Sequence, residues 1–528
     1  MPWVSAIILL PLLGALSMLA IPPGGLRQAR IHALVAAALT AALTVGLVVE
    51  FDRGVGTMQF VDRVGWAESV GLSWNVGVDG LSLWMIALTS GLFLLGIIAA
   101  CWRLPQRGRG FLAMLLLAEA SLLGLFAAGD LVLFYVFWEA MLVPFYLLIG
   151  LWGNADRRGA AIRFVIYTMF GSLLMLVAIL ATAFVARDIT GQFTFNIQDL
   201  QGVSFSSTQS TWLFLGFALA FAIKLPVFPF HGWLPRTYAA APIVVTGLIA
   251  AVMSKAGAYG FMRVAVPLFP EGADRFAIPL GLLAVTGIIY GALLAWRAPT
   301  MRLLVAYSSI SHLGFIALAI SVFDLQASQG AVLQMVNHGV IVAATFAIVG
   351  IINRACPDDV IDHVGGLGNG APRLAAIFLI VSMAALALPG SNAFAGEFIL
   401  LTGVFHQHAW LAGLATIGII YAAVYMLRLY QVTMNGPHAG GRAAGAELRV
   451  RDYVFLLPLI AAMLVIALWP RGIVDATTDT LARGIAPAQM AAQRPADQIR
   501  AVIVPNPPPD ALPLPGDPQT DNPQEPTP

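Results

Sequence analysis

Stretches of about twenty apolar residues follow one another along most of this 528-residue chain, and short polar turns separate them. Each stretch is long enough to cross about 30 Å of hydrocarbon as an α-helix, and about fourteen meet this criterion. They cover residues 2–21, 31–50, 80–102, 110–128, 131–152, 163–187, 211–233, 242–266, 276–296, 303–323, 328–352, 373–403, 409–430 and 452–470. The pattern predicts an all-α polytopic membrane protein with about fourteen transmembrane helices.

Proline interrupts two of these segments. The seventh contains Pro226 and Pro229, and the twelfth contains Pro389 followed by Gly390. Because proline removes a backbone donor and clashes with the preceding turn, we expect helices seven and twelve to be discontinuous. The five-segment spacing between the breaks predicts two inverted repeats of five helices, segments four to eight and nine to thirteen.

These repeats divide the chain into five parts. The parts are an N-terminal three-helix segment (1–109), a first antiporter-like repeat (110–266), a second antiporter-like repeat (267–435), the last transmembrane helix (436–475) and a Pro-rich disordered tail (476–528). The proline-rich, polar end of the chain, from Pro495 onward, has too few apolar residues to bury and is typical of an extended arm.

The composition agrees with a chain dissolved in lipid, since 59% of its residues are hydrophobic and only 10% are charged. The first segment has no basic region and no small-residue cleavage site, so we expect it to stay as a membrane span. The net charge of +1 indicates no nucleic-acid partner. Cys101 and Cys356 lack the spacing of a metal or iron–sulfur site, so we expect no metal and no cofactor in this chain.

The arginines are distributed unevenly among the loops. Seventeen of the 26 arginines lie in loops after odd-numbered segments, and nine lie after even-numbered segments or in the tail. Positive charge is retained on the cytoplasmic side of a membrane. The distribution therefore predicts a multi-pass protein with both termini outside the cytoplasm, which for a protein of the bacterial inner membrane is the periplasm.

Seven protonatable side chains lie deep inside the predicted spans, where a charged group costs at least about 2.5 kcal/mol. They are Glu119, Glu139, Lys224, Lys255, His312, His338 and Glu397. Counting from the nearest turns at about 1.5 Å of rise per residue puts all seven near mid-membrane. A row of such groups at one depth predicts lateral proton transfer between helices. The alternatives are a buried ion pair that only fixes packing and histidines that only hydrogen-bond across helices.

The choice of basic residue supports a proton relay. Arginine does not release its proton in a protein, whereas a buried lysine amine can. The only two lysines of the chain are Lys224 and Lys255, both inside predicted spans. The helix breaks lie beside the same groups: Lys224 precedes the proline-rich part of the seventh segment, and Pro144 disturbs the helix next to Glu139. Freed backbone carbonyls at membrane depth are typical of ion sites in transporters.

Five motifs carry a family resemblance. They are FYVFWEAMLVPFYLLIGLWG around Glu139, AIKLPVFPFHGWLPRTYAAAP around Lys224, LVAYSSISHLGF around His312, NHGVIVAATF around His338 and LALPGSNAFAGEFILL around Glu397. The chain resembles the antiporter-like subunits of respiratory complex I over nearly all of residues 1–470. The resemblance implies a proton-pumping subunit of NADH:quinone oxidoreductase that binds no cofactor. FMN, iron–sulfur clusters and quinone would lie in partner subunits, and L-type and N-type paralogues would be its neighbours.

The resemblance also implies roles for single residues. Glu139 and Lys224 would respond to the neighbouring unit, Lys255 would link the halves, and Glu397 would exchange protons with the far side. A glutamate at position 397 is typical of M-type members, since L-type and N-type members usually carry lysine there.

The chain departs from the family pattern at Thr300 and Arg302, where many members have an acidic residue and a lysine, and at Asn337, where many have serine. Three other functions stay open. They are a subunit of a multi-subunit Na+/H+ antiporter, the membrane arm of a hydrogenase-type complex, and a purely structural membrane scaffold.

Overall fold

The structure is a computed structural model that describes residues 2–22, 24–67, 72–435 and 445–493. Within these residues, twelve helices are long and apolar enough to cross a membrane. They are α1 with its last turn (Trp3–Ala20), α2 (Leu26–Glu50), α3 (Gly80–Trp102), α4 (Gly108–Ala127), α5 with α6 (Leu131–Trp152), α7 (Arg157–Thr190), α11 to α13 (Ile243–Leu268), α15 (Ala277–Arg297), α16 (Met301–Ile320), α17 (Leu325–Ile352), α19 with its last turn (Asn392–Asn435) and α20 (Val450–Leu468).

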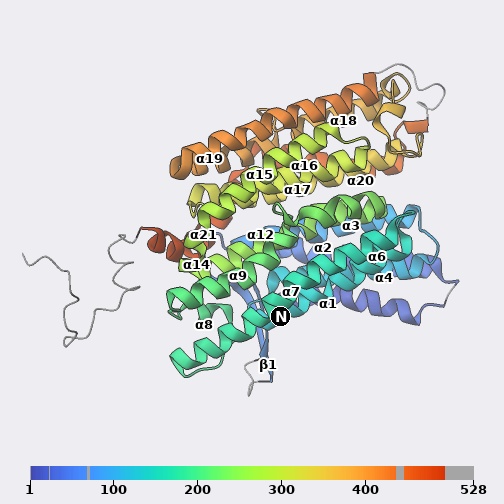
Figure 1. Cartoon of the computed structure of the whole chain (residues 1–528). Coiled ribbons are helices and arrows are strands. Elements are labelled where there is room, and N and C mark those ends of the chain that lie inside the picture. The colour runs from blue at the N-terminus through green and yellow to red at the C-terminus, as the bar shows by residue number, and fades with distance from the viewer. Residues whose placement is uncertain (1, 23, 68–71, 436–444, 494–528) are drawn as a thin grey trace, which may run out of the picture.

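The long helices lie roughly side by side in two halves (Figure 1). Helices α1 to α12 form one half, shown in blue and green, and α15 to α20 form the other, shown in yellow to orange. The short helices α8 (Ile197–Gln201), α14 (Pro270–Arg275) and α21 (Arg471–Ala492) lie at one end of the bundle. Helix α18 (Pro372–Ala385) begins at the other end, to which the arginine-rich loops belong.

Two of the predicted segments are broken, as their prolines indicate. Helix α9 (Ser207–Lys224) ends at Lys224, and the chain passes through a turn at Phe230–Trp233 before α10 (Leu234–Ala240) begins. Similarly, α18 ends at Ala385 before α19 starts. Neither α9 nor α18 is among the twelve long apolar helices, and α19 runs as one element through a kink at His408. The count of fourteen spans and the inverted repeats therefore stay predictions.

Smaller irregularities lie beside two other charged positions. Helix α5 (Leu131–Ala140) ends directly after Glu139, and α6 (Leu142–Trp152) contains Pro144 in its first turn. Two π-helical turns flank the short helix α12 (Lys255–Gly260), which begins at Lys255. Such π-turns occur mostly as local insertions in α-helices and frequently at functional sites.

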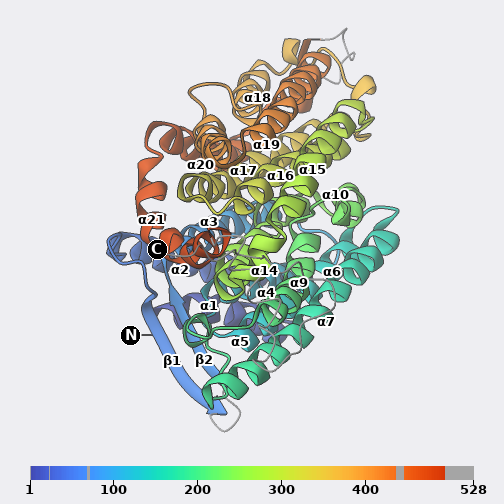
Figure 2. The same cartoon turned by 60° about the vertical axis from the view of Figure 1, so that its left-hand side comes forward.

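Two elements outside the spans were not predicted from the sequence. Strands β1 (Gln59–Ala67) and β2 (Leu72–Val78) form an antiparallel hairpin, and α21 follows the last span. The prediction of a disordered tail from residue 476 is wrong for 476–492, because α21 buries a stripe that includes Ile473, Thr477 and Leu481. It packs on α3, α14 and α17 and so joins both halves at one end of the molecule (Figure 2). The rest of the predicted tail, 494–528, lies outside the described residues.

The start of α3 fixes α21. The Gly80 amide donates to Thr480 Oγ1 at 3.2 Å, and a Cβ atom on Gly80 would lie 1.9 Å from the Ala476 carbonyl oxygen. Next to it, Asp79 forms a buried ion pair with Arg263 of the π-turn after α12. Arg263 is thus a buried cationic side chain in addition to the two lysines.

Candidate functional site

Four of the seven predicted residues form a line of contacts that begins at α12 in the first half and crosses the second half. Lys255 Nζ lies 2.7 Å from His338 Nδ1 and donates to the Ala250 carbonyl oxygen at 2.6 Å. The ring centroids of His338 and His312 are 5.7 Å apart, and His312 Nδ1 lies 3.1 Å from Glu397 Oε1. The line therefore runs from α12 through α17 and α16 to α19, and all four side chains are buried.

The break before α19 positions the end of this line. Asn337 Nδ2 donates to the Asn392 carbonyl oxygen at 2.7 Å, and Asn392 Nδ2 donates to Asn337 Oδ1 at 3.0 Å. This pair fixes the first turn of α19 against α17, beside His338. Gly396 permits the close approach, because a Cβ atom there would lie 2.6 Å from Gln334 Oε1. Asn337, a departure from the family pattern, thus contributes to the geometry of the site.

The structure adds two residues that the sequence reasoning missed. Gln334 Nε2 donates to Glu397 Oε1 at 2.9 Å, and the Tyr425 hydroxyl lies 3.2 Å from His312 Nε2. Gln334 could have been found, since it precedes His338 by four residues on the same helix face. Tyr425 stands in an apolar stretch of α19 and gives no such signal.

A small cavity of about 30 Å³ borders both histidines. His312, His338, Gln334 and Tyr425 all contribute to its lining. A cavity needs roughly 10 to 15 Å³ to hold one water molecule with polar partners. The cavity beside the two imidazole rings is therefore large enough for one water molecule.

The predicted charged groups of the first half differ from this line, because Lys224 Nζ, Glu139 Oε1 and both carboxylate oxygens of Glu119 have no hydrogen-bond partner among the described residues. Within the described residues, Lys224 Nζ has no hydrogen-bond partner and faces the rings of Trp138 and Phe164 at 5.2 and 5.6 Å. Glu139 Oε1 is also buried without a partner. Lys224 Nζ and the Glu139 carboxylate do not come within 4.0 Å of each other in the described structure, so the two groups form no direct ion pair. Their interaction acts through a longer distance, with the aromatic rings stabilising the ammonium group.

Glu119 stands apart from the other six residues. It is fully buried in α4, and neither carboxylate oxygen has a hydrogen-bond partner among the described residues. A buried polar group without a partner is costly and points to a functional role, an ordered water or a second arrangement of its surroundings.

The two lysines lie at neighbouring helix ends. Helix α9 ends at Lys224, and α12 begins at Lys255. A Cβ atom on Gly257 would lie 2.4 Å from the Phe221 carbonyl oxygen and 2.6 Å from the Leu225 amide nitrogen. This close contact between α9 and α12 joins the unpaired charges of the first half to the contact line of the second half.

The departures at Thr300 and Arg302 have structural roles. Thr300 caps α16 by accepting from the Leu303 amide at 3.3 Å, and Arg302 pairs with Asp359 at 2.8 Å.

Among the described residues, no group of three or more His, Cys, Asp or Glu side chains is placed to hold a metal ion.

In this line of described residues, His338 connects Lys255 to His312: it contacts both, and Lys255 and His312 do not contact each other directly. We expect His338→Leu to lower proton transport by about tenfold or more while the protein still assembles, because a positioned acid–base group contributes about 10²- to 10⁴-fold. Proton uptake into membrane vesicles, normalised to assembled protein, measures this effect. Tyr425→Phe is the matched control: it removes a side contact of His312 and leaves the line intact, so its transport should stay within about threefold of wild type. Normal transport by His338→Leu would remove this residue from the pathway.

Comparison with known proteins gives a consistent result. The family described as NADH:quinone oxidoreductase/Mrp antiporter, transmembrane, matches residues 128–422. NADH-quinone oxidoreductase subunit M of Mycobacterium tuberculosis H37Rv is 37% identical over 511 residues, covering 90% of this chain and 92% of that protein. The protein of the same name from Rhodobacter capsulatus is 37% identical over 461 residues, covering 86% of this chain and 90% of its own length.

Solved structures share the fold. A chain of respiratory complex I from Thermus thermophilus with bound NADH is 33% identical, with a TM-score of 0.82 over 91% of this chain and 99% of that chain. A chain of the Mrp complex from Dietzia sp. DQ12-45-1b has a TM-score of 0.79 over 96% of this chain and 100% of that chain. Its sequence is only 21% identical, so this second similarity concerns the fold alone.

Proposed function

The chain belongs to the family of NADH-quinone oxidoreductase subunit M, and from this premise we propose that it translocates protons in the membrane arm of that enzyme. The observation that carries the proposal is the buried line of Lys255, His338, His312 and Glu397. Intramembrane ionisable groups are rare and mark proton pathways when they face one another inside a bundle. A purely structural scaffold would not need such a line.

The contacts suggest the order of transfer within the second half. A protonated Lys255 donates to His338 Nδ1, and transfer along this bond leaves a neutral amine and a protonated imidazole. The cavity that both histidines line has room for a water that would pass the proton to His312. His312 Nδ1 then delivers it to Glu397, about ten residues before the polar turn at His406 to His408. Glu397 would exchange the proton with the far side of the membrane.

The first half supplies the trigger in this proposal. Within the part of the chain that the structure describes, Lys224 Nζ and Glu139 Oε1 have no hydrogen-bond partner, so their charge states respond to a charge brought near by a neighbouring subunit. A change there alters the field at Lys255, because α9 and α12 touch. Glu119 would join the relay from α4 through water.

Other parts of the enzyme would supply the redox chemistry. We expect FMN, iron–sulfur clusters and quinone to bind partner subunits and not this chain, with L-type and N-type paralogues beside it in the membrane arm. NADH-driven proton uptake by the purified complex, together with identification of the polypeptides that co-purify, tests the whole proposal. A chain that purifies without flavin-bearing and iron–sulfur-bearing subunits, and that exchanges Na+ for protons without NADH, would instead be part of an antiporter.

The arginine distribution predicts the orientation in a bacterial inner membrane. A reporter fused near Arg157 is expected to read cytoplasmic and one fused near residue 500 periplasmic, since positive loops stay inside. Alkaline phosphatase and a fluorescent protein at each position give opposite signals and control for expression. The reverse pair of readings would contradict the proposed orientation.

A further inference from the structure

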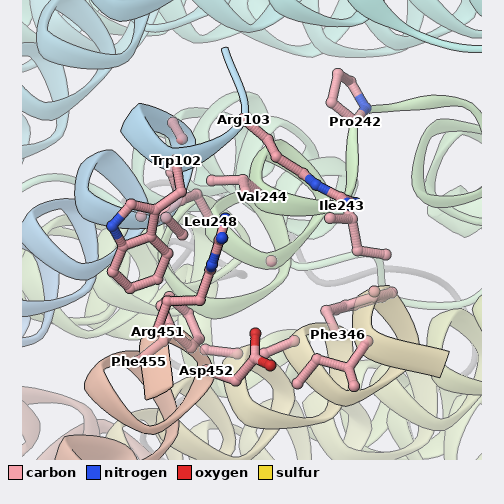
Figure 3. A pocket seen from close by; sticks show the side chains of 18 of the residues that line it. Trp102, Arg103, Pro242, Ile243, Val244, Leu248, Phe346, Arg451, Asp452 and Phe455 are labelled. Atoms are coloured by element: carbon pink, nitrogen blue, oxygen red, sulfur yellow. The ribbon is translucent and has the colours of Figure 1, made fainter. Parts of the chain in front are cut away.

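A cavity of about 300 Å³ lies between the two halves at the arginine-rich end of the bundle (Figure 3). Its walls come from the end of α3, the start of α11 (Ile243–Leu248), α17 and the start of α20. The proton line uses none of the residues that line it. It therefore needs an explanation of its own.

The inner walls are apolar and run deep into the membrane. Leu92 and Gly96 of α3, Leu248 of α11, and Ala343 and Phe346 of α17 contribute to them. The distance along α3 from Leu92 to the residue after its end is about 16 Å at 1.5 Å per residue. Apolar cavities stay dry and accept apolar ligands, so these walls suit a hydrocarbon chain better than a file of water.

Charge is concentrated at the mouth. Figure 3 shows the Arg103 and Arg451 side chains reaching into the cavity from opposite sides, one from α3 and one from α20. Neither has a carboxylate partner among the described residues. Arg354, in contrast, is neutralised by Asp452 through bonds of 3.0 and 2.7 Å. Two guanidinium groups are thus left to bind an anion from outside the chain.

Trp102 and Trp152 also line the cavity: Trp102 directly precedes Arg103, and Trp152 Nε1 donates to the carbonyl oxygen of Gln106 in the same loop at 2.7 Å. Tryptophan is enriched where the hydrocarbon of a bilayer meets its headgroups. The cavity therefore has a cationic mouth, an aromatic belt and an apolar interior in the order in which a phospholipid presents phosphate, glycerol and acyl chain.

We propose that this cavity binds one anionic phospholipid from the leaflet at the arginine-rich surface. Its phosphate lies between Arg103 and Arg451, whose planar forks match phosphate oxygens. One acyl chain occupies the apolar interior, since about 300 Å³ is at the lower end for ligand sites and leaves no room for a second. Basic pockets between membrane helices bind anionic headgroups in this manner. The lipid joins α3 and α11 to α17 and α20, at the opposite end of the molecule from α21.

Photo-crosslinking in the assembled complex tests the proposal directly. The complex is placed in nanodiscs containing phosphatidylglycerol with a diazirine at mid-chain, and in parallel nanodiscs containing phosphatidylcholine with the same label. The expected result is labelling of peptides that contain Leu92, Gly96 or Phe346, and labelling by phosphatidylglycerol should exceed labelling by phosphatidylcholine. Each basic residue near a membrane surface contributes about fivefold, so we expect a preference of about 25-fold for two arginines.

Variants separate the charge from the cavity. Arg103→Gln with Arg451→Gln should abolish the preference for phosphatidylglycerol, and Ala347→Phe, which fills the wall, should abolish labelling by both lipids. Arg158, an exposed arginine in the first turn of α7 at the same end, supplies the matched control: Arg158→Gln should keep the wild-type preference.

Three results would overturn the proposal, and the wild-type measurement alone can give the first two. The first is equal labelling by both lipids, and the second is absence of labelling at the cavity peptides. The third is rapid reaction of Ala347→Cys with a membrane-impermeant maleimide, which would show that the cavity is filled with water. None of these outcomes depends on proton pumping.

Discussion

Lys255→Arg is expected to give an assembled complex that pumps protons as poorly as Lys255→Ala, with a loss of about tenfold or more. Lys255 is fully buried, and its amine contacts His338 Nδ1 at 2.7 Å. A guanidinium keeps positive charge at this place but does not release its proton. If Lys255 acted only as a fixed charge, arginine would replace it, so the variant separates the two roles.

The measurement is NADH-driven proton uptake into oriented vesicles, normalised to assembled complex on native gels and to NADH turnover. Arginine is larger than lysine, so Lys255→Met serves as a control of similar size without charge. Three similarly low rates in assembled protein would support a releasable proton at Lys255. Near-normal pumping by Lys255→Arg would leave Lys255 as a fixed charge outside the relay.

The second large effect is expected at Lys224 and Glu139, where Lys224→Ala or Glu139→Gln should each abolish NADH-driven pumping without preventing assembly. Lys224 is buried and Glu139 is partly buried, and neither Lys224 Nζ nor Glu139 Oε1 has a hydrogen-bond partner among the described residues, so each charge sets the protonation of the other through the low-dielectric interior. Residues that act as a unit give losses that do not add. The double variant should therefore pump no worse than either single variant.

Phe164→Leu is the control for this pair, because it removes the ring that faces Lys224 Nζ at 5.6 Å and keeps both charges. We expect it to retain most of the pumping, since a cation–π contact contributes about 0.5 to 2 kcal/mol. Proton uptake in vesicles, measured together for the four variants, gives the coupling. Independent losses that multiply in the double variant would indicate separate roles, and normal pumping by Lys224→Ala would exclude Lys224 from proton transfer.

The sequence by itself indicated the long apolar helices, the two breaks at proline and seven of the protonatable groups inside the bundle. Hydropathy is a local property, so a run of about twenty apolar residues predicts a transmembrane helix wherever it occurs. Proline acts on its own helix, which is why the ends of α9 and α18 follow from the sequence. A charge inside an apolar run is equally visible without a structure.

Only the tertiary structure decided which of these groups touch. Lys255, His338, His312 and Glu397 meet because α12, α16, α17 and α19 have particular rotations, set by close contacts such as Gly396 against Gln334. Such rotations depend on packing between segments far apart in the chain, which no single segment encodes.

The same reason applies to the features that sequence analysis missed. Tyr425 gains its role only through contact with His312, and Lys224 is left without a partner because Glu139 lies on another helix beyond ion-pair distance. Helix α21 has too few apolar residues to be recognised as a span, yet it is stabilised by a narrow stripe that packs on α3 and α17. The apolar sequence around a group thus determines that the group is buried, and packing between helices determines which buried groups can exchange a proton.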